Sequence, residues 1–572
     1  MANTTAAVTP KSVPLNDKAW ARWTALLLLA LAMFCSYIFM DVLSPIKNLL
    51  QDTRGWDNTA FGTMQSAETF LNVFIFFLIF AGIILDKLGV RFTALLSGAV
   101  MLVGAVINWY ALTPEFEGTA LQQWFTDNLN YIPIFEQLGV SPFYEGMPAS
   151  AKLSAIGFMI FGCGTEMAGI TVSRGIVKWF QGREMALAMG SEMALARLGV
   201  ATCMIFSPVF ANLGGHVEVS RSVAFGVVML MIAMIMFIVY FFMDRKLDEQ
   251  TNIEEEKDDP FRISDIGKIL RSSGFWLVAM LCVLYYSAIF PFQKYAVNML
   301  QCNLTFTDVD PDSFWASDAV SVVQYVVMLA AAATAFASNF MSNKGMKYGL
   351  LGAGICALVA YCYMGYMRQS AAAIFAVFPL LAVGITPILG KYVDYKGKAA
   401  SMLVIGSLLL IACHLTFAFI LPEFKNSPVG GVIVAYLTIL VLGASFSLVP
   451  ASLWPSVPKL VDSKIIGSAY ALIFWIQNIG LWLFPLLIGK VLDATNTDVV
   501  AQVAAGTMTE DQAAVSYNYT YALLMLAGLG VAALLIGLWL KVIDRKHHYG
   551  LEEPNVKPTA ASEEAEVVAA EE

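Results

Sequence analysis

The feature that most constrains the fold is a series of apolar runs that recurs along all but the ends of the 572 residues. A run of about 18 residues or more is long enough for one helix to cross a bilayer. Only 13% of the residues are charged, against roughly 25% in soluble domains. The sequence therefore predicts an all-α membrane protein. We count fourteen runs, at residues 23–44, 60–85, 92–112, two within 161–199, 222–243, 274–297, 319–340, 348–366, 371–389, 402–421, 431–457, 466–492 and 521–542.

A strongly charged segment, DRKLDEQTNIEEEKDDPFRISDIGK, divides these runs into two halves. Its charge density excludes it from the bilayer and predicts a solvated linker. The last residues, ending in ASEEAEVVAAEE, lack aromatics and are expected to be disordered. The expected parts are an N-terminal tail 1–19, a first half 20–243, a linker 244–273, a second half 274–543 and an acidic tail 544–572.

The distribution of Lys and Arg predicts the orientation. The turns after even-numbered runs carry most of them, whereas the loop 113–151 has five acidic residues and no basic one. Because positive loops stay inside, both termini and the linker are expected in the cytoplasm and the loop 113–151 outside. Compact loops and the lack of an organelle-sorting signal favour a bacterial inner membrane. A net charge of −9 argues against nucleic acid as a partner.

Two polar turns match each other in spacing. GIILDKLGVR places Gly82, Asp86 and Gly89 before Arg91, and GKYVDYKGK repeats the spacing at Gly390, Asp394 and Gly397. Two such turns, one in each half, indicate a duplicated architecture. They resemble the signature loops of the major facilitator superfamily, which hold the cytoplasmic gate. We call these two segments the gate loops.

The resemblance implies two pseudo-symmetric six-helix bundles, but the count here exceeds twelve. The runs at 319–340 and 348–366 precede the second gate loop. We therefore expect an inserted two-helix hairpin, 319–366, which preserves parity and makes about fourteen helices. We interpret this hairpin as a peripheral addition.

Charges near the middle of two apolar runs indicate a site. Glu166 lies in the fourth run and Arg197 in the fifth. An unpaired charge at the bilayer midplane costs roughly 2.5–3.5 kcal/mol even on lenient scales, so each needs a partner or a cavity. Either the two bridge each other, or they face a substrate. A zwitterionic peptide offers an ammonium and a carboxylate that would complement the pair.

Several longer motifs narrow the resemblance: GTEMAG, VKWFQGRE, MALARLG, YYSAIFPF, SLWPSVPKLV and GSAYALIFWIQNIG. They are similar to the lysosomal dipeptide transporter branch of the superfamily and its bacterial relatives. That resemblance implies a uniporter in which Glu166 and Arg197 bind the peptide termini, helped by Trp454. The residues themselves add Tyr37, Tyr286 and Phe290 as candidate pocket walls, with Gln477 and Asn478 as candidate polar contacts.

Two functions and one remote alternative remain at this point. The first is a carrier of dipeptides or short peptides. The second is a carrier of another small solute, such as an organic anion or amino acid, with proton coupling through Asp41 or Glu68. The last is a non-transporting scaffold or receptor. No metal-ligand spacing, cofactor motif or nucleophile–base arrangement is present, so an enzyme is not expected.

Overall fold

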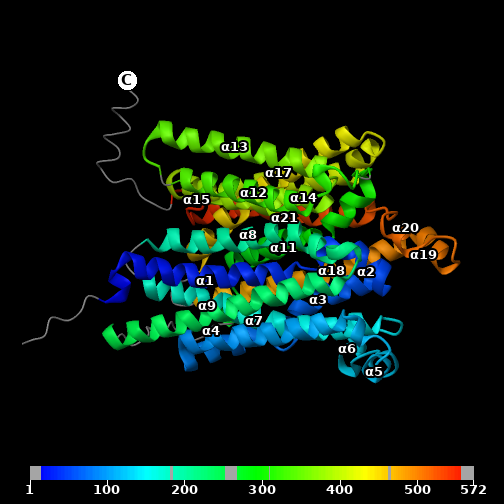
Figure 1. The fold of residues 1–572 in the computed structure, drawn as a ribbon. Helices are drawn as coiled ribbons and strands as arrows, with labels where there is room; N and C mark the ends of the chain where they lie inside the picture. Colours follow the sequence, from blue (N-terminus) through cyan, green and yellow to red (C-terminus); the bar gives the residue numbers. More distant parts are fainter. Residues whose placement is uncertain are drawn as a thin grey trace, which may run out of the picture.

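The computed structural model describes residues 14–138, 140–180, 184–251, 267–307, 309–339, 341–461 and 466–554. Within these ranges the regular structure is helical throughout (Figure 1). The long helices of the first half are α1 (Ala19–Met40), α3 (Asn58–Phe74), α4 (Phe77–Ala111), α7 (Ala149–Phe180), α8 (Met185–Ala211) and α9 (Val219–Thr251). Those of the second half are α11 (Ser273–Asn303), α12 (Asp318–Ser338), α13 (Lys344–Met367), α15 (Val377–Lys396), α16 (Ala399–Leu415), α17 (Pro428–Leu460), α18 (Ile466–Thr495) and α21 (Thr520–His547).

The described helices make the fourteen passes expected. Thirteen stretches are long and apolar enough to cross a membrane, and one of them is α4. This helix turns back at Gly89, where φ is 75° and ψ is 168°, a conformation that suits glycine. The part before Gly89 continues the pass begun by α3, and the part after it makes a separate pass. Counting the two parts of α4 as separate passes raises the number of passes from thirteen to fourteen.

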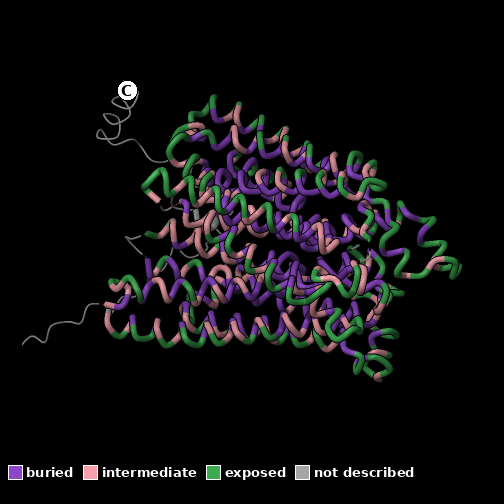
Figure 2. Tube along the Cα trace, turned by 45° about the horizontal axis from the view of Figure 1, so that its top comes forward, coloured by how far each residue is buried: buried purple, intermediate pink, exposed green. Residues whose placement is uncertain are grey.

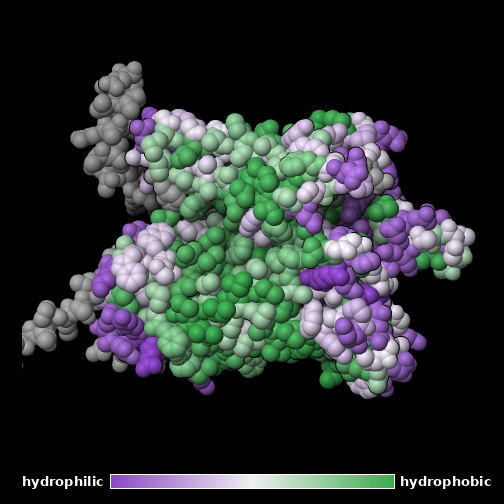
Figure 3. All heavy atoms as spheres, viewed as in Figure 1, coloured by the Kyte–Doolittle hydropathy of each residue, from purple (hydrophilic) through white to green (hydrophobic). Residues whose placement is uncertain are grey.

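The bundle has two distinct ends. The start of α1 and the end of α21 lie at one end, at the left of Figure 1, which we call the terminal end. The opposite, loop end carries short helices, among them α2 (Lys47–Arg54), α5 (Ala120–Asn128), α6 (Pro133–Gln137), α19 (Thr497–Ala504) and α20 (Glu510–Ala514). Between the two ends, the face in view is largely apolar and is bordered by hydrophilic residues (Figure 3). Such a surface is what a protein that crosses the bilayer presents to lipid.

Glycines bring α3, α4 and α7 into backbone contact. A Cβ at Gly162 would overlap the Glu68 carbonyl of α3, and one at Gly157 would overlap the backbone of α4. Lipid tails are as apolar as leucine, so helix association in membranes depends on close approach of this kind. The contact at Gly162 fixes the depth of Glu68 relative to α7, on which Glu166 lies one turn further.

The expected hairpin is formed by α12 and α13, which pack against each other. Helix α12 also contacts α8 of the first half and α15 of the second. Its Tyr325 hydroxyl lies 3.1 Å from the Thr202 hydroxyl of α8, and Arg368 donates to Gln324 at 2.7 Å. Helix α13, uppermost in Figure 1, is largely exposed (Figure 2). The hairpin thus lies along the seam between the halves, and α12 faces that seam.

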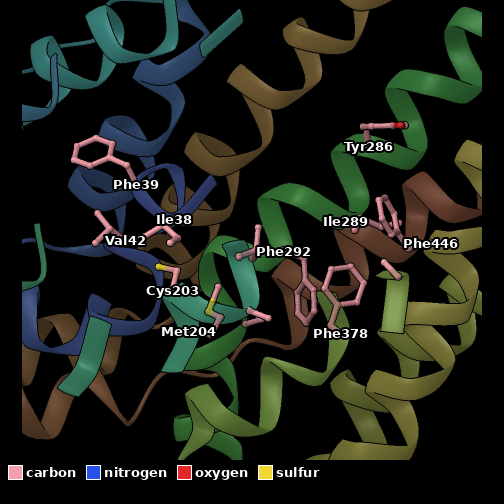
Figure 4. Packing of buried hydrophobic residues seen from close by; sticks show 14 of the residues in the cluster. Ile38, Phe39, Val42, Cys203, Met204, Tyr286, Ile289, Phe292, Phe378 and Phe446 are labelled. Atoms are coloured by element: carbon pink, nitrogen blue, oxygen red, sulfur yellow. The ribbon is translucent and has the colours of Figure 1, made fainter. Parts of the chain in front are cut away.

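One hydrophobic core runs through both halves. Figure 4 shows part of it, with Ile38 and Val42 near Cys203 of α8, and Phe292 of α11 near Phe378 of α15. This apolar packing surrounds the few charged side chains of the interior. The positions of those charged side chains are therefore set by the helices packed around them.

Candidate functional site

Arg197 lies in an aromatic cage at mid-depth. Its guanidinium carbon is 5.5 Å from the ring centre of Tyr37, 4.8 Å from that of Phe290 and 4.9 Å from that of Phe446. The three rings belong to α1, α11 and α17, so both halves contribute. Among the described residues no carboxylate forms an ion pair with Arg197. Cation–π contacts hold the guanidinium in place without neutralising it.

Glu166 lies on α7 and is also without an ion pair in the described parts of the chain. One of its carboxylate oxygens accepts a hydrogen bond of 3.2 Å from the Asn478 side-chain amide of α18. The Glu166–Arg197 bridge, the structural alternative left by the sequence, is therefore absent in this conformation. The depth of Glu166 matches that of Tyr37, since the neighbouring hydroxyls of Thr165 and Ser36 lie 3.3 Å apart.

The candidate aromatic walls come together in the second half. The Trp454 indole donates to the Tyr286 hydroxyl at 3.2 Å, and the Tyr286 and Phe290 ring centres are 5.3 Å apart. Phe446, which the sequence analysis did not select, joins Phe290 at 5.6 Å. A single phenylalanine in an apolar run carries no pattern that would have identified it. Together these rings form a continuous apolar surface that ends at Arg197.

Within the described parts of the chain Gln477 forms no hydrogen bond with Glu166, and its place is beside α11, one turn before Tyr286. Its amide oxygen accepts from the Cys282 thiol at 3.2 Å, which ties α18 to α11. The adjacent Asn478 is the residue that reaches Glu166. Successive residues on a helix point about 100° apart, so two neighbouring amides cannot both face the same charge.

Asp41 and Glu68 share one cation. The Lys294 ammonium of α11 lies 3.0 Å from an Asp41 oxygen and 3.7 Å from a Glu68 oxygen. Gln293 donates to the second Asp41 oxygen at 2.7 Å. Asp41 follows Tyr37 by four residues and Lys294 follows Phe290 by four, which is about 6 Å along a helix. This charged triad therefore covers the aromatic cage on its loop-end side.

Further contacts join the two halves at the loop end. The Asp493 carboxylate of α18 accepts from the Thr59 backbone at 2.8 Å, the Thr59 hydroxyl at 2.6 Å and the Asn58 amide at 2.8 Å. A carboxylate at the start of α3 also suits the positive end of the helix dipole. Lys47 donates to Asn298 at 3.1 Å. Neither pair is predictable from the sequence, because a polar residue at the end of an apolar run does not reveal its partner.

At the terminal end the two gate loops occupy corresponding places. Gly82 and Asp86 lie within α4, and Gly390 and Asp394 within α15, so each turn is shorter than the motif suggested. The chain reverses only at Gly89 and at Gly397, whose φ is 73°. Asp86 pairs with Arg174 at 2.9 Å, and Arg91 with Asp248 at 3.0 Å.

The second gate loop is held by the chain beyond α21. The Lys398 and Ala399 amides donate to the carbonyls of Glu552 and Leu551, at 3.2 and 3.0 Å. The Glu552 carboxylate accepts from the Ser401 amide at 2.8 Å, at the first turn of α16. Lys459 donates to the Gly550 carbonyl at 2.8 Å. This C-terminal segment, Gly550 to Glu553, fixes the start of α16.

A bundle of fourteen passes, with charged side chains at mid-depth where the halves meet, defines a multi-pass membrane transporter. Residues 29–372, more than half of the chain, match the family model described as Major Facilitator Superfamily. The chain belongs to this superfamily, as its gate loops predicted, and is therefore a carrier and not an enzyme.

The curated relatives are distant but match along most of their length. The chain is 22% identical to the lysosomal dipeptide transporter MFSD1 of Bos taurus over 481 residues, covering 82% of this chain and 80% of the bovine protein. It is 21% identical to the Homo sapiens protein of the same name, with coverage of 83% and 80%.

Solved structures show the same fold at lower identity. The nucleoside transporter NupG superposes with a TM-score of 0.56 at 12% identity, covering 90% of this chain and 99% of that one. A structure described as concerning substrate recognition in proton dependent oligopeptide transporters gives 0.52 at 11% identity, covering 91% and 99%. At this level of identity, these similarities show only that the fold is shared.

Proposed function

We propose that this protein carries dipeptides or short peptides across the membrane by alternating access. The observation that carries the proposal is the pair of opposite charges, Glu166 and Arg197, which lie at mid-depth in the described structure without bridging each other. Each unpaired charge costs roughly 2.5–3.5 kcal/mol in a bilayer on insertion scales. A zwitterionic peptide would give both residues a direct ion pair at once, its ammonium with Glu166 and its carboxylate with Arg197.

The aromatic surface supports a peptide over a smaller zwitterion. Tyr286, Phe290 and Trp454 form one wall, and Tyr37 lies on the opposite helix α1. Apolar walls with few polar groups are typical of sites that accept varied side chains. The distant dipeptide transporters among the curated relatives agree with this substrate class.

The contacts at the loop end support a carrier closed on that side. Asp493, Lys47 and the triad of Asp41, Lys294 and Glu68 all join the two halves there. Alternating access then requires these contacts to break when the loop end opens. On the distribution of Lys and Arg, we propose that the loop end faces the outside of a bacterial inner membrane and that both termini are cytoplasmic.

Thermal stability of the purified protein tests the substrate class. Dipeptides are expected to raise the melting temperature, whereas free amino acids and dicarboxylates are not. Peptides blocked at both ends should fail as well, because they lack the two charges. Stabilisation by dicarboxylates or amino acids alone would instead favour the second function, a carrier of another small solute.

Variants of the charged pair test the site. Glu166→Ala or Arg197→Ala should abolish the dipeptide-dependent shift in folded protein, since each removes one end of the charge match. The doubly exchanged variant, Glu166→Arg with Arg197→Glu, should not recover it. Recovery of transport in that variant would mean that the two residues bridge each other during the cycle, and the proposed site would be wrong.

A further inference from the structure

Two neighbouring short helices of the loop between α4 and α7 expose large apolar side chains (Figure 1). In α6, Ile134 is 72% exposed, and Leu138, directly after this helix, is 67% exposed. In α5, Trp124 is 51% exposed and Leu121 43%. We call these four side chains the apolar loop face. Apolar side chains gathered on a surface in this way mark a contact with a partner or with the membrane.

Each helix separates its apolar residues from its polar ones. Leu121 and Trp124 are three residues apart and lie on one side of α5, whereas Gln123 lies on the opposite side. Glu136 is two residues before Leu138, a rotation of about 200° around the helix. A surface helix of a globular protein buries its apolar side, but here that side is exposed. Such amphipathic helices are typical of segments that lie in the plane of a membrane interface.

An aromatic contact places α6 beside the bundle and not beyond its end. The Phe135 ring centre is 4.9 Å from that of Phe70 and 5.3 Å from that of Phe74, both on α3. These two residues follow the first residue of α3 by 12 and 16 positions, about 18 and 24 Å along the helix. Ile75 and Phe76, which come next in the chain, are exposed. Helix α6 therefore adjoins the apolar side of the bundle that faces lipid.

Helix α5 lies across the ends of two membrane-spanning helices. Its Phe125 is buried in a small cluster with Ala111, the last residue of α4, and Leu153, in the second turn of α7. The Lys152 ammonium of α7 donates to the Phe125 carbonyl at 3.0 Å, which holds α5 in place. Trp124 precedes Phe125 and so lies at the level where both spans end. Tryptophan is enriched at this level, where the bilayer meets water.

We propose that the apolar loop face inserts into the membrane interface at the loop end, with phospholipid acyl chains as its partner. The polar sides of α5 and α6 then lie among head groups and water. Residues 113–151 include five acidic residues and no basic one, so a zwitterionic lipid surface suits them better than an anionic one. The inserted segment also reaches the seam between the halves, because Phe74 packs on Trp482 of α18 at 4.9 Å.

The accessibility of spin labels in phosphatidylcholine nanodiscs tests this insertion. Oxygen concentrates in lipid, whereas the nickel complex NiEDDA stays in water, so the ratio of their collision rates identifies the phase around a label. Labels are placed at Leu138→Cys and Leu121→Cys, with the exposed Cys356 replaced by serine. Val106→Cys, on the exposed side of α4, gives the lipid reference. Asp498→Cys, exposed in α19, gives the aqueous reference.

Each apolar position has a matched control on the polar side of the same segment. Glu136→Cys is the control for Leu138→Cys, and Gln123→Cys is the control for Leu121→Cys. All four side chains are exposed, so a label at any of them should leave the fold intact. The oxygen-to-nickel ratio is expected to be several-fold higher at each leucine position than at its control, and close to the ratio at Val106→Cys.

Two other results would overturn the proposal. Ratios at Leu138→Cys and Leu121→Cys that equal those at their controls and at Asp498→Cys would place the apolar loop face in water. Exclusion of both reagents at the leucine positions would mean that a second copy of the chain covers this face in place of lipid. A lipid-like ratio in only one of the two helices overturns the insertion of the other.

Discussion

Asp41 and Glu68 compete for one ammonium, Lys294, and the triad therefore carries a net negative charge if all three groups are ionised. Within the described parts of the chain, the Asp41 carboxylate is held by three donors, from Lys294, Gln293 and Ser44, whereas Glu68 has only the longer contact to Lys294. These are the candidate proton sites from the sequence. The structure adds that they belong to the contact between the halves, so their state is linked to closure of the loop end.

We expect uniport, because neither carboxylate belongs to a recognisable proton relay. In liposomes, an inward proton gradient should not drive a neutral dipeptide above its equilibrium distribution. Accumulation that disappears in Asp41→Asn or Glu68→Gln would show that the carrier is proton-coupled through this triad. Asp127→Asn, in exposed helix α5, is the control, because the Asp127 carboxylate bonds only to Gln123 among the described residues.

For single residues, the sequence predicted which charged side chains belong to the site better than it predicted the residues that contact them. Glu166 and Arg197 were identifiable because a charge within an apolar run is costly and therefore conspicuous. Their surroundings were not, because the aromatic cage draws single residues from α1, α11 and α17, which are far apart along the chain. The sequence indicated Asn478 only together with its neighbour Gln477. The structure shows that Asn478 is the one that donates to Glu166.

Among the elements, α3 has an unusual amino terminus. Its own Asp57 caps the Ala60 amide at 2.6 Å, while Asp493 from the other half accepts from Thr59. Helix α3 is therefore capped across the seam, and it must exchange Asp493 for water whenever the loop end opens. The cap is worth about 1 kcal/mol on ordinary capping scales, enough to shift a balanced equilibrium several-fold.

Asp493→Asn should therefore favour opening at the loop end. Spin labels at Thr126→Cys and Asp498→Cys, with exposed Cys356 replaced by serine, report the distance between the halves. We expect a larger population of long distances in Asp493→Asn than with Asp493 intact. An unchanged distribution would show that this cap does not contribute to closure. Asp127→Asn again provides a neutralised carboxylate outside the seam.

The helix boundaries show which local signals can be read. The reversals at Gly89 and Gly397 were predicted within a few residues, because glycine in a repeated polar motif is a strong turn signal. The break between α3 and α4 was not, since Ile75 and Phe76 carry no such signal. Phe76 adopts a φ of 55°, which only its tertiary surroundings can impose.

For the whole molecule, the orientation of the bundle in the membrane is the property most open to a direct test. Cysteines introduced at Asn128 in α5 and at His547 at the end of α21 lie at opposite ends of the molecule. In intact cells and without Cys356, an impermeant thiol reagent should label Asn128→Cys only. Labelling of His547→Cys instead would reverse the orientation and place the gate loops outside.

The sequence predicted the number of passes and the family because both depend on length, parity and two repeated loops. It could not predict where the hairpin packs. All the long helices are apolar on most faces, so hydropathy does not rank one neighbour above another. Polar groups such as Tyr325 and Gln324 position α12. Their partners, Thr202 and Arg368, can be identified only in the structure.

The C-terminal segment has a practical consequence for anyone who attaches a fluorescent reporter or purification tag. The last helix stops at His547, which would suggest a harmless place for a fusion. Leu551 and Glu552, however, contact the second gate loop, and the Glu552 carboxylate caps α16. A tag joined directly after His547 would replace the segment that holds the start of α16. A tag placed after Pro554, behind a spacer, would leave those contacts in place.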